Sequence, residues 1–437
     1  MPVSQREKAV SIVKRLRENG YEAYLAGGCV RDDLLGRSPE DYDIATAGKP
    51  EAVRKIFSDT VEVGAQFGVV LVVVDGEPFE VATFRYDGPY LDGRRPSHVR
   101  FSSMEEDILR RDFTINGMMY DPIEDRVIDL VDGKGDLASR LIRAIGDPGE
   151  RFQEDRLRMV RAVRLAASLG FTVEENTFQA IRQHASQVTR ISWERIGDEV
   201  TRVLTEGAAR RGFELLDSTL LLKAILPEVE AMKGVEQSPD YHPEGDVFIH
   251  TLLTLSHLGD PTETLAYGCL LHDLGKPACA RKEGARITFY GHAETGAEMA
   301  VAVLKRLKRS RSVWERVAYL VKNHLRHTQA PKMRQSTLKR FLAEEGIHEL
   351  LEIARIDALS SGGDLQHYQF CRQKMAELIE EEIRPEPLLN GRDLIAMGFS
   401  PGPLFKEILE RVEEAQLEGE IRSGDEARKW VSARYKG

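Results

Sequence analysis

One stretch of this sequence, residues 25–45, constrains the fold more than any other because it joins a glycine turn to two closely spaced aspartates. It reads Leu-Ala-Gly-Gly-Cys-Val-Arg-Asp-Asp-Leu-Leu-Gly-Arg-Ser-Pro-Glu-Asp-Tyr-Asp-Ile-Ala. The pattern predicts a strand, a turn, a short helix and a second strand that opens at Asp41. Side chains two apart on a strand share a face, so Asp41 and Asp43 are expected to project together. Such a carboxylate pair, beside substrate phosphates, suits Mg²⁺.

The glycine turn predicts an anion site next to these acids. Gly27 and Gly28 leave the backbone bare just before the expected helix begins. Amide N–H groups there, together with the positive end of the helix dipole, suit a triphosphate, and Arg31 adds a fixed positive charge. Each part alone is common on ordinary turns and solvated loops, but the joint pattern favours a nucleotide site.

These residues closely resemble the nucleotidyltransferase motif of the class II tRNA nucleotidyltransferases, the CCA-adding enzymes and their bacterial poly(A) polymerase relatives. The resemblance implies that Asp41 and Asp43 are catalytic and hold Mg²⁺. It implies that Gly28 and Arg31 contact the incoming nucleotide. It also implies an α+β fold, in which a small mixed-sheet head like that of polymerase beta precedes an all-α neck, body and tail.

Composition is that of a multidomain protein without a membrane segment. The 437 residues are 42% hydrophobic, enough for two to four domains. The first 19 residues are charged and amphipathic, and the longest apolar run, 69–74, is too short to cross a bilayer, so we expect a cytoplasmic protein. A net charge of −10 argues against nonspecific coating of nucleic acid but allows a local basic track. No Cys-x-x-Cys pair occurs, which predicts reduced, buried thiols at Cys29, Cys269, Cys279 and Cys371.

Strand and helix signals fill the rest of the expected head. Apolar spacing predicts a helix over 4–18 that stops at Asn19-Gly20, and strands over 61–63, 69–75 and 79–85 with a hairpin at Asp75-Gly76. A further strand and turn are expected over 121–132, and strand signals stop after Ile145. Glu80 lies on one of these strands as a candidate third acid, but alternation alone does not tell which face it takes.

Residues 85–98 are rich in turn formers and lack periodicity, so they predict a surface loop. Loops of this length in compact domains are often functional. This one resembles the flexible loop with which CCA-adding enzymes switch from C to A addition. Because members that add only C typically lack the loop, the resemblance argues against a CC-only enzyme.

A second motif follows at residues 105–117, where Arg-Arg-Asp-Phe-Thr-Ile-Asn resembles the family pattern Arg-Arg-Asp-Phe-Thr-x-Asn. Two guanidiniums beside an acid that orients one of them suit phosphate or ribose contacts. The resemblance implies that Arg111 binds nucleotide, whereas Arg110 is the alternative structural member of the pair.

From Arg151 the pattern is almost entirely helical, and 154–164 places Asp155 and three arginines at successive threes on one helix face. A surface helix with ion pairs is the plainer interpretation. The alternative is a protein template: cytosine and adenine both present an amine donor beside a ring-nitrogen acceptor, which Asp155 and Arg158 complement, whereas uracil and guanine do not. This matches the family motif Glu-Asp-x-x-Arg, which also implies nucleotide contacts for Arg161 and Arg164.

A second constellation lies in the expected body. His250 precedes His272-Asp273, and Asp357 follows at long range, with His292 and His324 between them. Imidazole and carboxylate together suit a divalent transition metal or Mg²⁺. The pattern resembles the HD phosphohydrolases, which implies a second divalent metal at His250, His272, Asp273 and Asp357. Two alternatives for this domain are equally weighted. It hydrolyses a phosphoester, such as a 2′,3′-cyclic phosphate on damaged tRNA, or it is a scaffold that merely retains the motif.

These motifs divide the chain into a nucleotidyltransferase head (1–145), a neck with the templating helix (146–227), an HD-like body (228–384) and a helical tail that binds tRNA (385–437). The predicted function is template-independent addition or repair of the tRNA 3′ CCA end from CTP and ATP, by two-metal nucleotidyl transfer. The alternatives are an A-adding enzyme or a poly(A) polymerase, which share every motif, and, from another class, an HD metal-dependent phosphohydrolase or RNA-binding protein.

Overall fold

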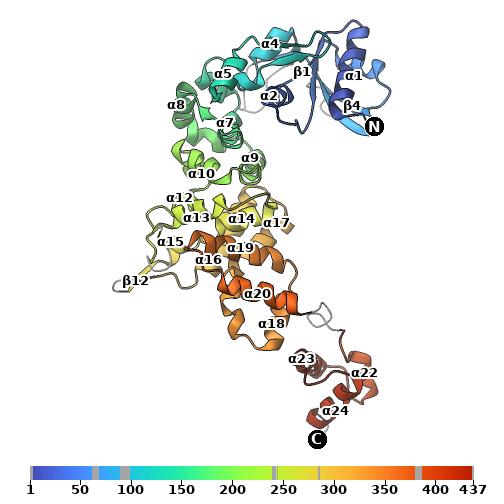
Figure 1. Cartoon of the computed structure of the whole chain (residues 1–437), viewed down its shortest axis with the longest axis vertical. Coiled ribbons are helices and arrows are strands. Elements are labelled where there is room, and N and C mark those ends of the chain that lie inside the picture. Colours follow the sequence, from blue (N-terminus) through green and yellow to red (C-terminus); the bar gives the residue numbers. More distant parts are fainter. Residues whose placement is uncertain are drawn as a thin grey trace. The chain divides into compact units, whose positions relative to one another are not determined.

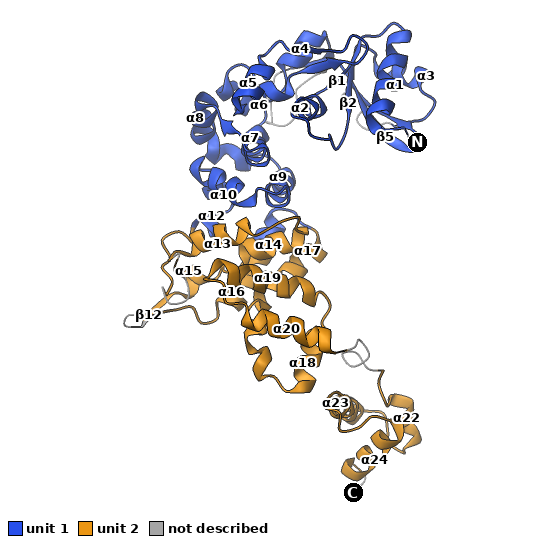
Figure 2. Ribbon diagram, in the orientation of Figure 1, with its two compact units in different colours: residues 1–230, 303–309 blue, residues 231–302, 310–437 orange. Residues whose placement is uncertain are grey.

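The computed structural model describes residues 3–61, 68–88, 99–238, 243, 245–283, 286–378 and 386–435. The chain forms two compact units (Figure 2), the first comprising residues 1–230 with 303–309 and the second 231–302 with 310–437. Among the described helices, none combines the length and the apolar character needed to cross a bilayer.

Unit 1 contains a seven-stranded mixed sheet in the order β3-β4-β5-β2-β1-β8-β9. Figure 1 shows this sheet with β1 and β4 labelled. Only β2 and β5 pair in parallel among these neighbours. The sheet strands are β1 (Ala23–Ala26), β2 (Asp43–Thr46), β3 (Thr60–Val61), β4 (Val69–Val74), β5 (Glu77–Thr83), β8 (Met119–Asp121) and β9 (Arg126–Ile128). The mixed-sheet head followed by helices confirms the predicted α+β class.

Several local predictions in the head are confirmed. Helix α1 (Gln5–Glu18) begins at a capping box on Ser4 and ends at Asn19, and β4 and β5 form the hairpin around Asp75-Gly76. The predicted strand over 79–85 is wrong at its end, because β5 stops at Thr83 and Arg85 opens a separate ribbon, β6 (Arg85–Asp87) with β7 (Val99–Phe101). Most of the predicted switching loop lies between them, outside the described residues.

The strand predicted to open at Asp41 instead opens at Asp43, so Asp41 lies just before β2. Helix α2 (Gly28–Leu34) connects β1 to this region, and its N-cap Gly27 has φ +80° and ψ −131°, a conformation that favours glycine. The remaining helices of the head are α3 (Pro50–Ile56), α4 (Met104–Leu109), the 3₁₀ turn η2 (Thr114–Asn116) and α5 (Gly133–Ser139).

The predicted continuous helix over 154–164 is wrong. Helix α6 (Pro148–Glu154) ends at Asp155, which has an extended backbone, and α7 (Leu157–Leu169) starts after Arg156. Strands also recur after Ile145, contrary to prediction, because β11 (Thr172–Val173) pairs in parallel with β10 (Leu141–Ile142). The other helices before residue 231 are α8 (Glu175–His184), η3 (Ala185–Arg190), α9 (Trp193–Thr205), α10 (Ala209–Ser218), α11 (Leu221–Ile225) and α12 (Pro227–Glu230).

In its described residues unit 2 is mostly helical, and it contains a small hairpin that the sequence did not predict, β12 (Arg281–Glu283) and β13 (Arg286–Thr288). Helix α16 belongs to it up to residue 302, after which the chain rejoins unit 1 until residue 309. The helices are α13 (Val247–Ser256), α14 (Glu263–Leu271), α15 (Lys276–Cys279), α16 (His292–Arg306), α17 (Arg311–Asn323), η4 (Arg326–Lys332), α18 (Gln335–Leu342), α19 (Ile347–Ser360) and α20 (Gln366–Glu377).

The C-terminal helices α22 (Gly391–Ala396), α23 (Pro403–Leu417) and α24 (Gly424–Tyr435) bury a small core of their own that includes Ile408, Val412 and Ile421. Leu404 shares their spacing in the sequence but is exposed. All four cysteines are free thiols, as predicted, although Cys279 is only partly buried.

Candidate active site and metal centre

The acids of the head converge because β2 and β5 run in parallel. Their register pairs Ile44 with Val81, which sets Asp43 and Glu80 side by side, one position earlier on adjacent strands. Asp43 is half-buried and feels the negative charge of both Glu80 and Asp41. Three carboxylates therefore share one small region, and the face taken by Glu80, which the sequence left open, is the face of the other two acids.

Electrostatics at this cluster favour a bound cation. Burial, then the charges of Glu80 and Asp41, raise the pKa of Asp43 to about 7. Partial burial and the charge of Asp41 also raise the pKa of Glu80. Carboxylates whose ionised forms destabilise one another in this way form a fitting ligand set for a hard divalent cation such as Mg²⁺.

The glycine turn brings the positive groups to the same place. A Cβ at position 27 would lie 3.1 Å from Nη1 of Arg111 and 4.0 Å from Oδ2 of Asp43. Arg31 pairs with Asp32 and donates a hydrogen bond of 2.8 Å from Nη1 to the side-chain oxygen of Asn116. The bare backbone at Gly27 therefore lies between a guanidinium and a candidate cation ligand, as a nucleotide triphosphate requires.

Arg110 and Arg111 share one buried acid. Asp107 accepts hydrogen bonds from Nη2 of Arg110 at 2.6 Å and from Nη2 of Arg111 at 3.1 Å. Nε of Arg111 is buried without a hydrogen-bond partner among the described residues. The acid that orients the two arginines is thus Asp107, which precedes Arg110 by three positions and Arg111 by four, and not Asp112 within the motif.

Asp155 and Arg158 are each held by a protein partner. Arg195 of α9 donates to both carboxylate oxygens of Asp155, at 2.7 and 3.2 Å. Arg158 is buried and donates to Glu154 at 2.7 Å and to the carbonyl of Arg110 at 3.1 Å. Both side chains are therefore fixed in direction, and one of them is linked to the motif that carries Arg111.

The two further arginines of α7 form ion pairs within unit 1. Arg161 contacts Asp112 through two hydrogen bonds of 2.9 and 2.7 Å. Arg164 is buried and its guanidinium is occupied by Glu199 at 2.7 Å and Glu206 at 3.0 Å. Arg161 consequently ties α7 to the head motif, and Arg164 ties α7 to α9; their nucleotide contacts stay a prediction.

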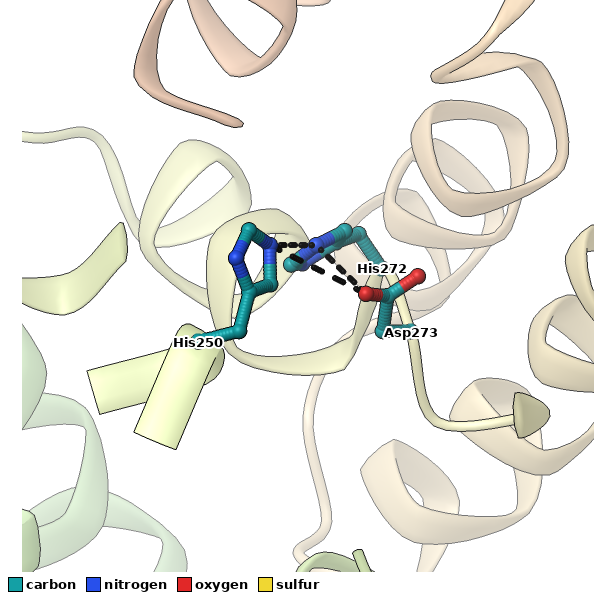
Figure 3. Close-up of side chains that lie close together, drawn as sticks. All are labelled: His250, His272 and Asp273. Carbon is teal, nitrogen blue, oxygen red and sulfur yellow. Dashed lines mark hydrogen bonds and ion pairs between the residues drawn. The ribbon is translucent and has the colours of Figure 1, made fainter. Parts of the chain in front are cut away.

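The four residues of the expected second metal site meet in unit 2, three of them shown in Figure 3. Nε2 of His250 lies 3.2 Å from Nε2 of His272 and 3.0 Å from Oδ1 of Asp357. Nε2 of His272 lies 3.2 Å from Oδ2 of Asp273. Helices α13, α14 and α19 thus bring together side chains that are far apart in the sequence. His250 and Asp357, for example, are separated by 107 positions.

This cluster is buried and rich in charge. Burial opposes ionisation of Asp273, but His272 and Lys276 outweigh it and hold its pKa well below the ordinary value. Nζ of Lys276 lies 2.6 Å from Oδ2 of Asp273 and 2.6 Å from the side-chain oxygen of Gln237. Burial, followed by the charge of His272, lowers the pKa of His324 to about 4, so this ring stays neutral and able to bind a metal near neutral pH.

The sequence pointed to no role for Asn116 or Asp107, and it predicted Arg195 only as an ion partner in helix packing, without its contact to Asp155. Each acts by holding another residue, and such pairing depends on contacts between elements that no local pattern records. His292 and His324 were noted in the sequence without an assignment, and both lie within 4.0 Å of Oδ1 of Asp273.

Comparison with family models matches three segments of the chain. Residues 23–143 match the poly(A) polymerase head domain, 170–233 match the probable RNA and SrmB-binding site of polymerase A, and 247–362 match the HD domain. The order of these segments agrees with the order of the sites described above.

Similar proteins extend over almost the whole chain. A CCA-adding enzyme of Streptococcus suis is 31% identical over 440 residues, covering 97% of this chain and 95% of the relative. One from Levilactobacillus brevis is 32% identical, covering 95% and 94%. The crystal structure of the Bacillus stearothermophilus CCA-adding enzyme in complex with CTP superposes with a TM-score of 0.76 at 28% identity, covering 100% of this chain and 98% of the other. The chain therefore belongs to the family of CCA-adding enzymes, as its motifs predicted.

Proposed function

We propose that this chain builds or repairs the 3′-terminal CCA of tRNA from CTP and ATP without a nucleic-acid template. The observation that carries the proposal is the approach of Arg111 and Asp43 to the bare backbone at Gly27, which brings phosphate-binding and cation-binding groups into one site. The similarity to CCA-adding enzymes over 97% of the chain supports the same function.

In this proposal Asp41, Asp43 and Glu80 would hold Mg²⁺. When bound, the metal supplies activation of the terminal hydroxyl and stabilisation of the departing pyrophosphate. The amides near Gly27 and Gly28, together with the guanidiniums of Arg31 and Arg111, would bind the triphosphate. Helix α2 carries Gly28 and Arg31 and directly follows strand β1, and β1 pairs with β2, which carries Asp43. The sheet would therefore hold the anion site at a constant distance from the acids.

In this proposal, Asp155 and Arg158 at the start of the neck select the base of the incoming nucleotide. Asp155 accepts and Arg158 donates, which complements the pairing edges of cytosine and adenine but leaves uracil and guanine with unpaired groups. Arg195 positions Asp155 through its two hydrogen bonds. The same pair serves both nucleotides, so residues 146–227 would act as the template, and residues 385–437 would bind tRNA.

The experiment that tests this function supplies tRNA ending at the discriminator base, at C and at CC, with CTP and ATP, and sizes the products. Completion of all three to CCA supports the proposal. Extension of only the CC-ending tRNA would assign an A-adding enzyme, and runs of A on every substrate would assign a poly(A) polymerase.

A second function is favoured by the convergence of His250, His272, Asp273 and Asp357 in unit 2. We propose that these residues hold a divalent transition metal and hydrolyse a phosphoester, with a 2′,3′-cyclic phosphate on damaged tRNA as the candidate substrate. When bound, the metal supplies a nucleophile near neutral pH by acidifying water. The buried imidazoles and carboxylates are the donor types that such metals prefer.

This second function is tested by assaying cyclic-phosphate hydrolysis with Mg²⁺, Mn²⁺, Ni²⁺ and Co²⁺, in the wild type and in His272→Ala. Loss of hydrolysis in the variant supports the assignment. Absence of hydrolysis with every metal in the wild type would reduce the cluster to a structural role.

A further inference from the structure

Asp107, a buried acid of α4, is shared by the motif that carries Arg111 and by the ribbon of β6 and β7. Its Oδ1 accepts a hydrogen bond of 3.2 Å from the backbone N–H of Arg85, the first residue of β6, and one of 2.6 Å from Nη2 of Arg110. Its Oδ2 accepts a hydrogen bond of 3.1 Å from Nη2 of Arg111. One carboxylate therefore connects the base of the ribbon to the guanidinium that lies beside Gly27.

The carboxylate of Asp107 is charged in this position. Burial opposes its ionisation, but the positive charges of Arg111 and Arg110 outweigh burial and lower its pKa. Hydrogen bonds that an ionised carboxylate accepts are roughly twice as strong as those between neutral groups. Asp107 therefore holds both the guanidinium of Arg111 and the backbone N–H of Arg85 firmly.

The contact with Asp107 determines which end of Arg111 faces the nucleotide site. Nη2 of Arg111 is bound to Asp107, whereas Nη1 lies 3.1 Å from the position of a Cβ on Gly27 and 3.5 Å from the carbonyl oxygen of Asn116. A guanidinium is planar and its donors have fixed directions, so a contact that holds Nη2 also sets the direction in which Nη1 donates. Asp107 thus orients the donor next to the bare backbone at Gly27.

The first residue of the ribbon also lies near the acids of the head. Burial and the charge of Asp41 raise the pKa of Glu80, and the positive charge of Arg85 opposes them. The side chain of Arg85 therefore acts on Glu80, while its backbone N–H is held by Asp107. The base of the ribbon is consequently linked to the groups proposed to bind phosphate and to those proposed to bind the cation.

A second connection between α4 and the ribbon is weaker. Glu106 accepts hydrogen bonds of 3.0 and 3.2 Å from Nη2 of Arg100 in β7, but the two side chains are 41% and 61% exposed. Exposed ion pairs contribute little, because water and salt screen them. The buried contact at Asp107 is therefore the stronger link between the ribbon and the rest of the head.

We propose that Asp107 is a positioning residue that couples the β6–β7 ribbon to triphosphate binding through Arg111. Phosphate bound to Arg111 holds its guanidinium, and with it Asp107 and the N–H of Arg85, in one arrangement. Coupling between two sites is reciprocal, so an ordered ribbon strengthens phosphate binding by the same factor. The inference rests on the nucleotide site proposed in the head and adds Asp107 and the ribbon to it.

The test uses pyrophosphate, which carries phosphate groups like those of a nucleotide but has no base. Binding of pyrophosphate to the full chain with Mg²⁺ is measured by calorimetry, and hydrogen–deuterium exchange of the ribbon is compared with and without saturating pyrophosphate. The amide of Arg85 is itself the donor to Asp107, so its exchange reports the contact directly. We expect pyrophosphate to slow the exchange of the ribbon amides about fivefold or more.

Two variants interrupt the connection at different points. Asp107→Asn keeps the size of the side chain but removes its charge, and Arg111→Ala removes the guanidinium. Each is expected to weaken pyrophosphate binding roughly tenfold and to abolish the protection of the ribbon at saturating pyrophosphate. Because Asp107 acts through Arg111, the double variant should lose no more affinity than Arg111→Ala alone. Glu105→Gln, which changes an exposed carboxylate of the same helix, is the matched control and keeps both binding and protection.

The outcomes distinguish this coupling from the function on which it rests. Pyrophosphate that binds the wild type without slowing exchange in the ribbon would overturn the coupling and leave the proposed function standing, as would CTP that binds when pyrophosphate does not. No binding of either ligand would overturn both. Protection that persists in either folded variant would also overturn the coupling. Since Arg111→Ala leaves the buried acid in place, the test remains decisive if Asp107→Asn does not fold.

Discussion

Asp43 feels the negative charges of Glu80 and Asp41, and this crowding makes Glu80 a candidate third cation ligand. We expect Glu80→Gln to lower nucleotide addition roughly 100-fold, because it removes a cation ligand that is needed for the chemical step. Asp41→Ala and Asp43→Ala are expected to abolish addition while tRNA binding changes little. The measurement is the rate of CTP incorporation as Mg²⁺ is varied.

Glu51→Gln serves as the control for these variants, since Glu51 is an exposed carboxylate on α3. Retained incorporation in both aspartate variants would contradict the assignment of the acids. An unchanged Mg²⁺ dependence in Glu80→Gln would restrict the cation site to the two aspartates.

The proposed role of Asp155 and Arg158 in base choice leads to a prediction about nucleotide selectivity. Asp155→Ala and Arg158→Ala should reduce use of CTP and ATP and weaken discrimination against UTP and GTP, because an unpaired group on the wrong base is no longer penalised. Arg195→Ala frees the carboxylate of Asp155 to rotate and should weaken discrimination about tenfold with a smaller loss of rate. Competition among the four nucleotides measures both effects.

Arg190→Ala, at an exposed arginine of the same helical region, is the control for Arg195→Ala. If Asp155→Ala, Arg158→Ala and Arg195→Ala all left the relative incorporation of the four nucleotides unchanged, these residues would only form ion pairs and would not select the base.

At the scale of elements, the ion pair between Asp112 and Arg161 joins the head motif to α7. Burial alone would raise the pKa of Asp112, but Arg161 outweighs it and lowers the pKa to about 2 from 3.8. A lowered pKa in the folded state stabilises the protein above pH 4, and this contribution is lost as the pH falls from about 4 towards 2. We expect Asp112→Asn to cost at most about 2 kcal/mol of unfolding free energy at pH 7.

Urea unfolding at pH 7, 4 and 3 measures this difference, which should be present at pH 7, nearly unchanged at pH 4 and smaller at pH 3. Asp198→Asn is the control, because the carboxylate of Asp198, which pairs with Arg309, is largely exposed and should contribute little. A difference that does not depend on pH would contradict the role of the Asp112 carboxylate.

Local signals predicted some elements well and others not at all. The capping box on Ser4 and the turn at Asp75-Gly76 are written in adjacent residues, so α1 and the β4–β5 hairpin were predictable. The break at Asp155 was not, because the apolar spacing of α7 continues through it and the extended backbone is held by Arg195, 40 positions away. Likewise, β11 exists only through its parallel pairing with β10.

The candidate sites divide in the same way. The residue types that carry chemistry could be read from motifs, since Asp41, Asp43, His272 and Asp273 stand in short patterns. The face of Glu80 depended on the parallel register of β2 and β5, which no alternation within one strand contains.

The segment between β6 and β7 contains most of the predicted switching loop, and we expect the order of additions to depend on it. Its ends are paired through Arg85–Phe101 and Asp87–Val99, so shortening the segment between them should leave the sheet and its acids in place. We expect such a deletion to spare C addition and to impair A addition. Extending a tRNA that ends at CC, compared with one that ends at the discriminator base, measures the effect; an equal loss of both additions would make the loop a general substrate clamp.

At the scale of the whole molecule, the two candidate centres lie in different compact units and share no residue. The acids of the head belong to β2 and β5, whereas the histidine cluster belongs to α13, α14, α16, α17 and α19. Each centre should therefore be inactivated separately. We expect Asp43→Ala to abolish CCA addition but to retain Mn²⁺ bound in unit 2, and His272→Ala to lose that Mn²⁺ while CCA addition to intact tRNA continues.

A tRNA ending in a 2′,3′-cyclic phosphate after the CC sequence joins the two activities in one assay. The blocked end lacks the free 3′ hydroxyl that nucleotide addition requires. Water must break the bond between phosphorus and O3′, which frees the 3′ hydroxyl and leaves a 2′ phosphomonoester, so the wild type should add A only after this hydrolysis by unit 2. His272→Ala should leave this substrate unextended while it extends the same tRNA with a free hydroxyl at the normal rate. Since Asp43→Ala should open the cyclic phosphate without adding A, mixing the two variants should restore extension. Failure of the mixture, with each single activity present, would show that the two steps require one and the same chain.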